Sequence, residues 1–342
     1  PELTAPRLKQ AFGSGTVVLA GGTVDFPAAT TLANSVQVTQ DSTLSLGTSG
    51  NAAVVLNGLG LTGTSGRTLT ITPTVATTTG TRVRVNNGLT NSFTFDANLV
   101  LNGTFTFATY NNDGDQVYNG VISGAGTLGR RSPTGGVAGR TILNGDNTYS
   151  GGTVIADGAI GFGISSTGSP TVTSGPIGTG ALSLENNVNT LHRLFASGGP
   201  RTVGNAITWP AGVNQDLTIE GSNALTLTGD MDLGGSTRTI ACNNSANSTL
   251  GGIISNGGLT KTGPGVLVLN GVNTYSGSTT VSNGTLAGIG TIAGPLDVEN
   301  PGNLAPGITG IGTLTVNGDV TLNGNTTVDV NAATTGSDLV TG

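Results

Sequence analysis

The sequence predicts an all-β protein, a parallel, right-handed β-solenoid that forms a single elongated rod. Three observations lead to this fold class. Apolar residues recur two positions apart, which places both members of a pair on one face of a strand. Gly-rich or Asn-rich breaks separate most of these pairs, so the strands are short. One stretch also recurs without a gap, because Tyr275 follows Tyr149 and Leu269 follows Leu143 by the same 126 residues, and internal repeats are typical of solenoids.

The composition agrees with a repetitive β structure. The chain has 342 residues, of which 59 are Gly and 9% are charged, whereas an average globular domain has about 25% charged residues. Few charges and many glycines argue against an ordinary enzyme. Disorder is the alternative, because the same residue types dominate flexible linkers. Since apolar residues make up 35% of the chain and fall at alternate positions, we predict a folded protein.

Charge and cysteine content exclude several classes of function. The net charge of -6 removes any broad electrostatic attraction to nucleic acid or to an anionic membrane surface. No apolar run approaches the roughly 20 residues that span a bilayer. The single cysteine, Cys242, is predicted to be a small buried hydrophobe. The chain begins at Pro1 without a signal-like segment, so it is either cytoplasmic or a mature, processed product.

The first residues differ from the rest of the chain, since residues 1–12 carry three charges and two prolines without alternation. We interpret residues 1–15 as an N-terminal arm or cap and residues 16–342 as one continuous solenoid, because no later shift in composition marks a domain boundary. Strand pairs fill most of the second region. They include Val17 and Leu19, Val24 and Phe26, Val36 and Val38, Leu44 and Leu46, Leu69 and Ile71, Leu182 and Leu184, Leu217 and Ile219, Leu225 and Leu227, Met231 and Leu233, Leu314 and Val316, Val320 and Leu322, and Val328 and Val330.

Three stretches within the solenoid have patterns of their own. Between Phe93 and Phe107, the sequence Phe-Thr-Phe, Leu-Val-Leu and Phe-Thr-Phe predicts successive strands that share one interior. After Gly163, a cluster of Ser, Thr, Gly and Pro predicts a loose lateral loop. Residues 188–200 are the least repeat-like, and we expect a longer loop packed on one face.

The repeated stretch is the most specific feature of the sequence. Its second copy reads Gly263-Pro-Gly-Val-Leu-Val-Leu-Asn-Gly-Val-Asn-Thr-Tyr-Ser-Gly277, and its first Thr141-Ile-Leu-Asn-Gly-Asp-Asn-Thr-Tyr-Ser-Gly151. The pattern resembles the autotransporter-associated β-strand repeat, also called the passenger-associated transport repeat. The second copy follows it nearly throughout, whereas a longer loop up to Arg140 replaces the expected Lys-x-Gly in the first. We place the repeat corners at residues 120–163 and 251–290.

The resemblance implies a protein that is secreted and works in mature form outside the bacterial cell or on its surface. It implies a structural or adhesive function, without catalytic residues, metal or cofactor, and we expect a subunit of a head-to-tail extracellular filament or of a biofilm matrix fibre. The alternatives are a monomeric passenger, or stalk, segment of an autotransporter and a polysaccharide-active β-helix enzyme. The expected partners are further copies of the chain, with an extracellular polysaccharide or neighbouring cells in addition, but no nucleic acid and no membrane insertion.

Recurrence at matched positions predicts structural roles for the residues of the two corners. We expect the tyrosine rings to pack over the turn and the asparagine side chains to cap free backbone groups. The corner residues are Asn147, Tyr149 and Gly151 in the first copy and Asn273, Tyr275 and Gly277 in the second.

Two acidic pairs are candidates for chemistry. Asp230 and Asp232 flank one strand residue and point out of the same face, and Asp113 and Asp115 flank a glycine in a break. Paired carboxylates act as acid and base or bind calcium. No Lys, Arg or His lies beside either pair in sequence, and neither pair completes a calcium loop. We interpret both as solvated turn and face residues.

The remaining polar candidates are one histidine and three arginines. Because His192 is the only histidine, no multi-histidine metal site exists within one chain, and we expect a loop histidine with a structural hydrogen bond. Arg130, Arg131 and Arg140 form the densest basic cluster. We interpret it as a solvated corner insertion; contact with an acidic polysaccharide or a neighbouring subunit is the alternative.

The ends of a solenoid present open strand edges, which bind another strand unless they are capped. We therefore expect one subunit to extend the next, which produces a filament because such a contact does not close on itself. The alternative is a monomeric rod with loops over both ends. The residues expected at the joint are Arg7, Lys9 and Phe12 of one subunit and Asp338, Leu339 and Val340 of the other.

Overall fold

The structure of the protein is a computed structural model. It describes residues 15–26, 30–46, 53–56, 61–73, 82–86, 92–103, 106–110, 114–131, 139–185, 191–210, 212, 216–308, 310–331 and 336–341. The predicted N-terminal arm lies outside these residues apart from Gly15. Every regular element in the described ranges is a strand, and none of these residues is helical. The parallel strands stack as a β-solenoid, which confirms the predicted fold class.

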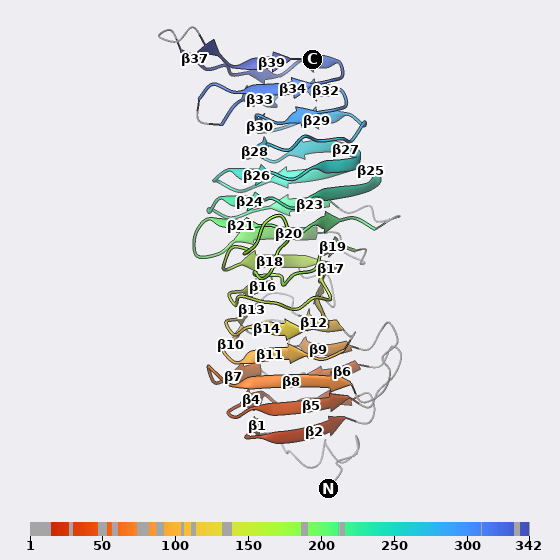
Figure 1. Cartoon of the computed structure of the whole chain (residues 1–342), viewed down its shortest axis with the longest axis vertical. Helices are drawn as coiled ribbons and strands as arrows, with labels where there is room; N and C mark the ends of the chain where they lie inside the picture. Colours follow the sequence, from red (N-terminus) through yellow and green to blue (C-terminus); the bar gives the residue numbers. More distant parts are fainter. Residues whose placement is uncertain are drawn as a thin grey trace. The chain divides into compact units, whose positions relative to one another are not determined.

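The chain divides into two compact units, Pro1–Leu182 and Ser183–Gly342. Within each unit the strands stack coil upon coil (Figure 1). One continuous rod of fixed shape stays a prediction, and the units are considered one at a time below. The described part of either unit lacks a helix with the length and hydrophobicity of a membrane span.

The described residues of the first unit form four ladders of parallel strands. One ladder contains β1 (Val17–Leu19), β4 (Val36–Val38) and β7 (Leu61–Gly63). The second contains β2 (Gly22–Phe26), β5 (Ser42–Leu46), β8 (Thr68–Pro73), β11 (Asn98–Leu101) and β14 (Ile122–Gly124). The third contains β3 (Thr30–Leu32), β6 (Ala53–Leu56), β9 (Arg82–Asn86), β12 (Thr106–Tyr110), β15 (Thr127–Arg131) and β17 (Thr153–Ile155). The fourth contains β10 (Phe93–Phe95), β13 (Asp115–Tyr118), β16 (Arg140–Leu143) and β18 (Gly158–Phe162).

Columns of apolar side chains fill the interior of the first unit. Leu69 of β8 pairs with Leu99 of β11, which pairs with Ile122 of β14, and all three are buried. Near the next ladder, the rings of Phe93 and Phe107 lie edge-on to Tyr118, with centroids 5.8 and 6.1 Å away. Such edge-on pairs stabilise a core beyond the area they bury. The aromatic stretch therefore forms one interior, with Tyr118 at its centre.

The second unit repeats this architecture, and β19 (Leu182–Leu184) lies at the sequence boundary between the units. One ladder contains β21 (Arg201–Val203), β24 (Leu225–Leu227), β26 (Ser248–Leu250), β28 (Val266–Leu269), β30 (Thr285–Gly288), β33 (Asn303–Pro306) and β36 (Asn325–Thr326). In another, β20 (Leu191–Ala196), β23 (Asp216–Ile219) and β22 (Ile207–Thr208) lead to β25 (Met231–Cys242), β27 (Ile254–Thr262), β29 (Thr279–Val281), β32 (Leu296–Val298) and β35 (Val320–Leu322). The third contains β31 (Thr291–Ile292), β34 (Thr313–Val316) and β39 (Leu339–Thr341), and β37 (Val330–Asn331) and β38 (Gly336–Ser337) form an antiparallel hairpin.

A leucine column marks the core of the second unit. Leu267 pairs with Leu286, and Leu286 with Leu304, so equivalent side chains stack in three successive coils, and all three are buried. Paired residues here lie 19 and 18 positions apart, whereas Leu69 and Leu99 of the first unit lie 30 apart. Because the strands stay in register, the corner loops absorb the difference in coil length.

The predicted loop at residues 188–200 is wrong where the structure describes it. Residues Leu191–Ala196 form β20, in which His192 pairs with Leu217 and Leu194 with Ile219. His192 and Leu194 are both buried. Alternation thus continues through this stretch, but the polar residues His192 and Arg193 conceal it in the sequence.

Candidate functional site

Tyr149 and Tyr275 occupy matching positions at the two repeat corners. Both rings are buried, and their hydroxyl oxygens lie 2.5 Å from the Thr153 hydroxyl and 2.6 Å from the Thr279 hydroxyl. Burial disfavours the phenolate and raises the pKa of Tyr275 from 10 to about 12, although the hydrogen bond to Thr279 lowers it in part. Burial also raises the pKa of Tyr149. Both tyrosines are therefore neutral core residues with a hydrogen-bonded hydroxyl.

Asn273 connects its own corner to the coils on both sides. Its Oδ1 accepts the backbone N–H of Ile254 at 2.9 Å, and its Nδ2 donates to the carbonyl of Thr291 at 2.9 Å. The backbone N–H of Asn273 donates to the same Thr291 carbonyl at 3.0 Å. Since the side chain is buried, its removal would leave the N–H of Ile254 without this partner at a cost of about 1–3 kcal/mol, while the Thr291 carbonyl would keep the backbone N–H of Asn273.

Asn147 makes the corresponding contacts in the first repeat, but to a different element. Its Oδ1 accepts the N–H of Ile122 at 2.6 Å, while its Nδ2 donates to the carbonyl of Pro176 at 2.7 Å. Pro176 belongs to the stretch after Gly163, which is predicted as a loose lateral loop. Ile177 of this stretch is buried. The loop is therefore packed against the corner, and the prediction of a loose loop is wrong.

Glycine at the end of each corner allows two coils to approach closely. A Cβ atom on Gly277 would lie 2.4 Å from the carbonyl oxygen of Gly257, and one on Gly151 would lie 2.5 Å from the carbonyl oxygen of Gly126. No side chain fits at such distances unless the backbone moves, which costs about 1–3 kcal/mol. The glycines therefore fix the spacing of the coils at both corners.

A buried lysine lies beneath the second corner. The ammonium group of Lys261 donates to the carbonyl oxygens of Thr262 at 2.9 Å, Gly263 at 2.8 Å and Asn283 at 2.8 Å. Burial lowers the pKa of Lys261, and the neighbouring thiol of Cys242 raises it in part. Three carbonyl oxygens thus take the place of a carboxylate partner. Cys242 is itself buried, as predicted.

Arg130 takes the place of Lys261 in the first repeat. Arg130 pairs with Ile155, and Lys261 pairs with Val281. Val281 follows Ile155 by 126 residues, the same distance that separates the two corners. The Arg130 guanidinium is buried and donates to the carbonyl of Gly139 at 2.7 Å. The interpretation of Arg130 as part of a solvated insertion is therefore wrong. Its strand position faces inward, and the side chain caps carbonyl groups inside the solenoid.

The other two arginines of this cluster lie outside the core. Arg140 is exposed and forms a two-point ion pair with Asp115, with distances of 2.9 Å from Nε to Oδ1 and 2.6 Å from Nη2 to Oδ2. The two residues are opposite each other in β16 and β13. Sequence analysis missed this pair because its members belong to neighbouring coils. Arg131 is half-buried, and Asp113 lies outside the described residues.

The candidate acids Asp230 and Asp232 bind backbone and amide groups. Asp230 Oδ1 accepts the N–H of Ile253 at 2.9 Å. Asp232 Oδ1 accepts the N–H of Gly234 at 2.9 Å and the side-chain amide of Asn256 at 3.0 Å. These contacts agree with the interpretation of both residues as parts of turns and faces.

His192 has a structural contact, although it lies in a strand and not in a loop. Its Nε2 lies 2.9 Å from the carbonyl oxygen of Glu185. Within the described ranges, His, Cys, Asp and Glu side chains form no group of three that would hold a metal ion.

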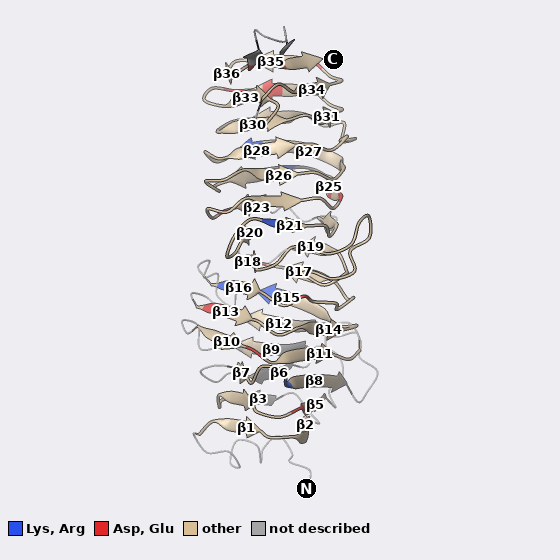
Figure 2. Ribbon diagram, turned by 60° about the vertical axis from the view of Figure 1, so that its left-hand side comes forward, with Lys and Arg blue, Asp and Glu red and all other residues tan. Residues whose placement is uncertain are grey.

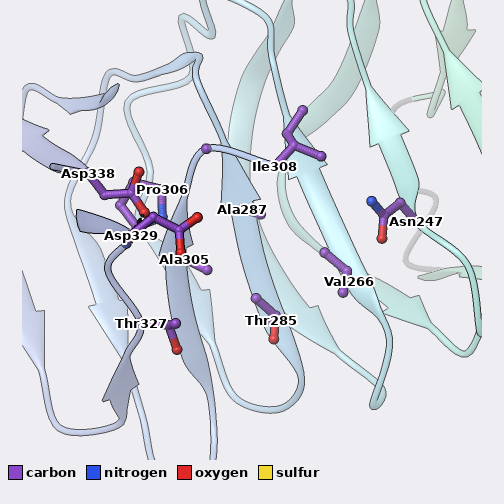
Figure 3. Close-up of a pocket in the computed structure, with 11 residues that line it drawn as sticks. Asn247, Val266, Thr285, Ala287, Ala305, Pro306, Ile308, Thr327, Asp329 and Asp338 are labelled. Carbon is purple, nitrogen blue, oxygen red and sulfur yellow. Dashed lines mark hydrogen bonds between the residues drawn. The ribbon is translucent and has the colours of Figure 1, made fainter. Parts of the chain in front are cut away.

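A shallow groove crosses the outer face of β28, β30 and β33 in the second unit (Figure 3). Its volume is about 190 Å³. Short side chains form the floor in two columns, since Val266 pairs with Thr285 and Ala287 with Ala305. Ile308 projects at one side of the groove (Figure 3). Its ends are polar, with Asn247 at one end and two aspartates at the other (Figure 3).

The two aspartates of this groove differ in what they bind. Asp338 is buried, and its carboxylate accepts the N–H of Gly312 and the N–H of Asp329, both at 2.8 Å. Asp329 is exposed, and its carboxylate forms no hydrogen bond with a described residue. The Asp338 carboxylate therefore connects the backbone at Gly312 to that at Asp329, while the Asp329 side chain is exposed to solvent. Among the other residues expected at the joint, Leu339 is exposed and Val340 half-buried, while Arg7, Lys9 and Phe12 lie outside the described residues.

Comparison with known proteins agrees with the two corners. The family model of the passenger-associated transport repeat matches residues 138–160 and 259–287. The first match begins in the last residues of the predicted insertion, which ends at Arg140, and the second contains both Lys261 and Tyr275. None of the curated proteins and solved structures that were compared with the chain matches it. The β-solenoid thus carries two copies of the passenger-associated transport repeat, as the sequence predicts.

Proposed function

We propose that the protein is a secreted structural or adhesive component of the bacterial surface, and that its copies join head to tail into an extracellular filament or matrix fibre. The repeat supports the coarser part of this proposal, since the passenger-associated family points to a secreted or cell-surface protein. The observation that supports the assembly is apolar surface on the coil of β35, β36 and β39, on which no described strand stacks.

Inward-facing apolar residues of this last coil are exposed. Val320 pairs with Leu296 and Leu322 with Val298, and both partners are buried. Val320 and Leu322 themselves are 39% and 49% exposed. The pair forms the predicted strand, β35, but its side chains are exposed because no described strand stacks on the free edge of β35.

The other strands of this coil also have inward-facing residues that are less buried than their partners in the preceding coil. Val340 pairs with Leu314, which is buried, but Val340 is only half-buried. Thr326 pairs with buried Leu304 and is exposed. An open coil of this kind offers unpaired backbone groups and apolar surface to a further strand. A coil from a second copy would pair with these backbone groups and cover this apolar surface. Burial of apolar surface contributes about 25 cal/mol per Å².

The second candidate function is a monomeric passenger segment, or stalk, of an autotransporter, which the repeat itself favours. A polysaccharide-active enzyme receives less support, because Asp230 and Asp232 already bind neighbouring groups. Negative-stain electron microscopy of the purified protein, at concentrations from 1 µM to 1 mM, separates the first two. We expect filaments of uniform width that lengthen with concentration. Single particles of constant length at all concentrations would contradict the proposal and favour the stalk.

A further inference from the structure

We infer that the groove of Figure 3 is the receptor for residues 1–12 of a second copy of the chain, and that Asp329 binds the cationic side chain of Arg7 or Lys9. This inference rests on the proposed head-to-tail assembly and names the contact that secures it. The acidic residue assigned to the joint is therefore Asp329 and not Asp338, which the sequence predicts. Both carboxylate oxygens of Asp338 already accept backbone hydrogen bonds.

The charges of the two segments are complementary. From residue 262 to the last residue the sequence contains no Lys or Arg and five acidic residues, Asp297, Glu299, Asp319, Asp329 and Asp338. Figure 2 shows no basic residue on the strands from β30 to β36. Residues 1–12 contain Arg7 and Lys9 with a single acid, Glu2. Two of these acids, Asp329 and Asp338, line the groove, and no Lys or Arg does. A basic segment is therefore attracted to the groove within the range of about 8–10 Å that salt allows.

The shape of the groove suits an extended chain. In an extended segment Arg7 and Lys9 lie on the same side, because they are two positions apart. Their alkyl stems can lie along an apolar floor while the charged ends reach a polar partner. Ala287 and Ala305 provide such a floor, and the Asp329 carboxylate lies at its end (Figure 3).

The position of the groove agrees with the proposed joint. Thr327, which lines the groove, directly follows β36 of the exposed last coil, and Asp329 precedes the hairpin of β37 and β38. A second copy that stacks its first coil on this last coil brings β1 to the joint. Residues 1–12 directly precede β1 in sequence, so they reach the groove without a long connection.

The test is a titration of the full-length protein with a fluorescein-labelled synthetic peptide of residues 1–12, followed by fluorescence anisotropy. We expect saturable binding that becomes about fivefold weaker in the Asp329→Asn protein, the loss of one exposed ion pair. Asp319→Asn is the matched control, because Asp319 is also exposed but does not line the groove. A peptide with Arg7→Gln and Lys9→Gln should bind more weakly to the unchanged protein and equally to the Asp329→Asn protein.

Three results would overturn the inference: no saturable binding, equal effects of Asp329→Asn and Asp319→Asn, or equal binding of a scrambled peptide. Saturable binding of a neutral glycan to a protein that does not bind the peptide would assign the groove to saccharides instead. Light scattering on the same protein samples keeps the two proposals apart. Assembly without peptide binding contradicts the groove alone, and peptide binding by a protein that stays monomeric contradicts the filament alone.

Discussion

Replacement of Tyr275 by Ala tests the second repeat corner. The substitution removes a buried ring, which costs about 3–5 kcal/mol for an aromatic residue in a core. It also leaves the buried hydroxyl of Thr279 without the partner that it has at 2.6 Å, which adds to the loss. We therefore expect the free energy of unfolding to fall by about 4 kcal/mol in urea titrations followed by circular dichroism.

Matched variants separate the ring from its hydroxyl and from the surface. Tyr275→Phe keeps the ring and should cost about 1 kcal/mol. Tyr149→Ala should resemble Tyr275→Ala because both rings are buried and both hydroxyls are hydrogen-bonded to a threonine. Thr274→Ala at an exposed position should change stability by less than about 0.5 kcal/mol. Since stacked coils can unfold in blocks, hydrogen exchange of β27 and β29 gives a local measure. A loss below about 1 kcal/mol, with unchanged exchange in these strands, would refute the structural role of the corner.

Three further predictions concern buried charges and acids. Stability should fall as the pH rises above about 10.5, because burial raises the pKa of Tyr275 from 10 to about 12 and the unfolded chain therefore releases this proton first. The group costs about 3 kcal/mol by the end of its window. Urea titrations from pH 10.5 to 12 that show constant or rising stability would contradict this. Lys261→Met should lower the free energy of unfolding by about 2 kcal/mol or more, since three carbonyl groups lose their donor. Lys261→Arg should cost less. Equal melting temperatures of the wild type and Lys261→Met would show that the ammonium group is dispensable. Changing Asp230 and Asp232 together to Asn retains their acceptor oxygens and should cost less than about 1 kcal/mol, and a glycan-cleaving activity that disappears in this variant would overturn the non-catalytic function.

The fold class and the repeat corners could be predicted from the sequence because both depend on local patterns. Alternation identifies inward-facing residues wherever they are apolar, as in the column of Leu267, Leu286 and Leu304. The same rule was available for Lys261, which lies two residues after buried Leu259 and therefore faces inward. Its charge obscured that signal, because a buried cation is expected only when acceptors surround it. Here the acceptors include Asn283, from another coil.

Contacts between coils could not be predicted in the same way. The ion pair of Arg140 and Asp115 depends on the length of the coil that separates them, and coil lengths vary with the corner loops. The same holds for the groove, whose floor combines residues from successive coils and whose acidic end comes from the hairpin of β37 and β38. Exposure of Val320 and Leu322 depends on what stacks above them, and their alternation carries no information about that.

The most direct test of head-to-tail assembly is the molar mass of the purified protein as a function of concentration, measured by light scattering for the wild type and for Leu322→Glu. We expect the wild-type mass to rise continuously with concentration and the variant to stay near the 33.6 kDa of one chain, because a carboxylate at the joint would be buried without a partner. Val272→Glu, at a position that is 64% exposed in a coil within the stack, should assemble like the wild type. A wild-type mass of one chain at every concentration, or equal assembly of Leu322→Glu and Val272→Glu, would contradict assembly through the open last coil.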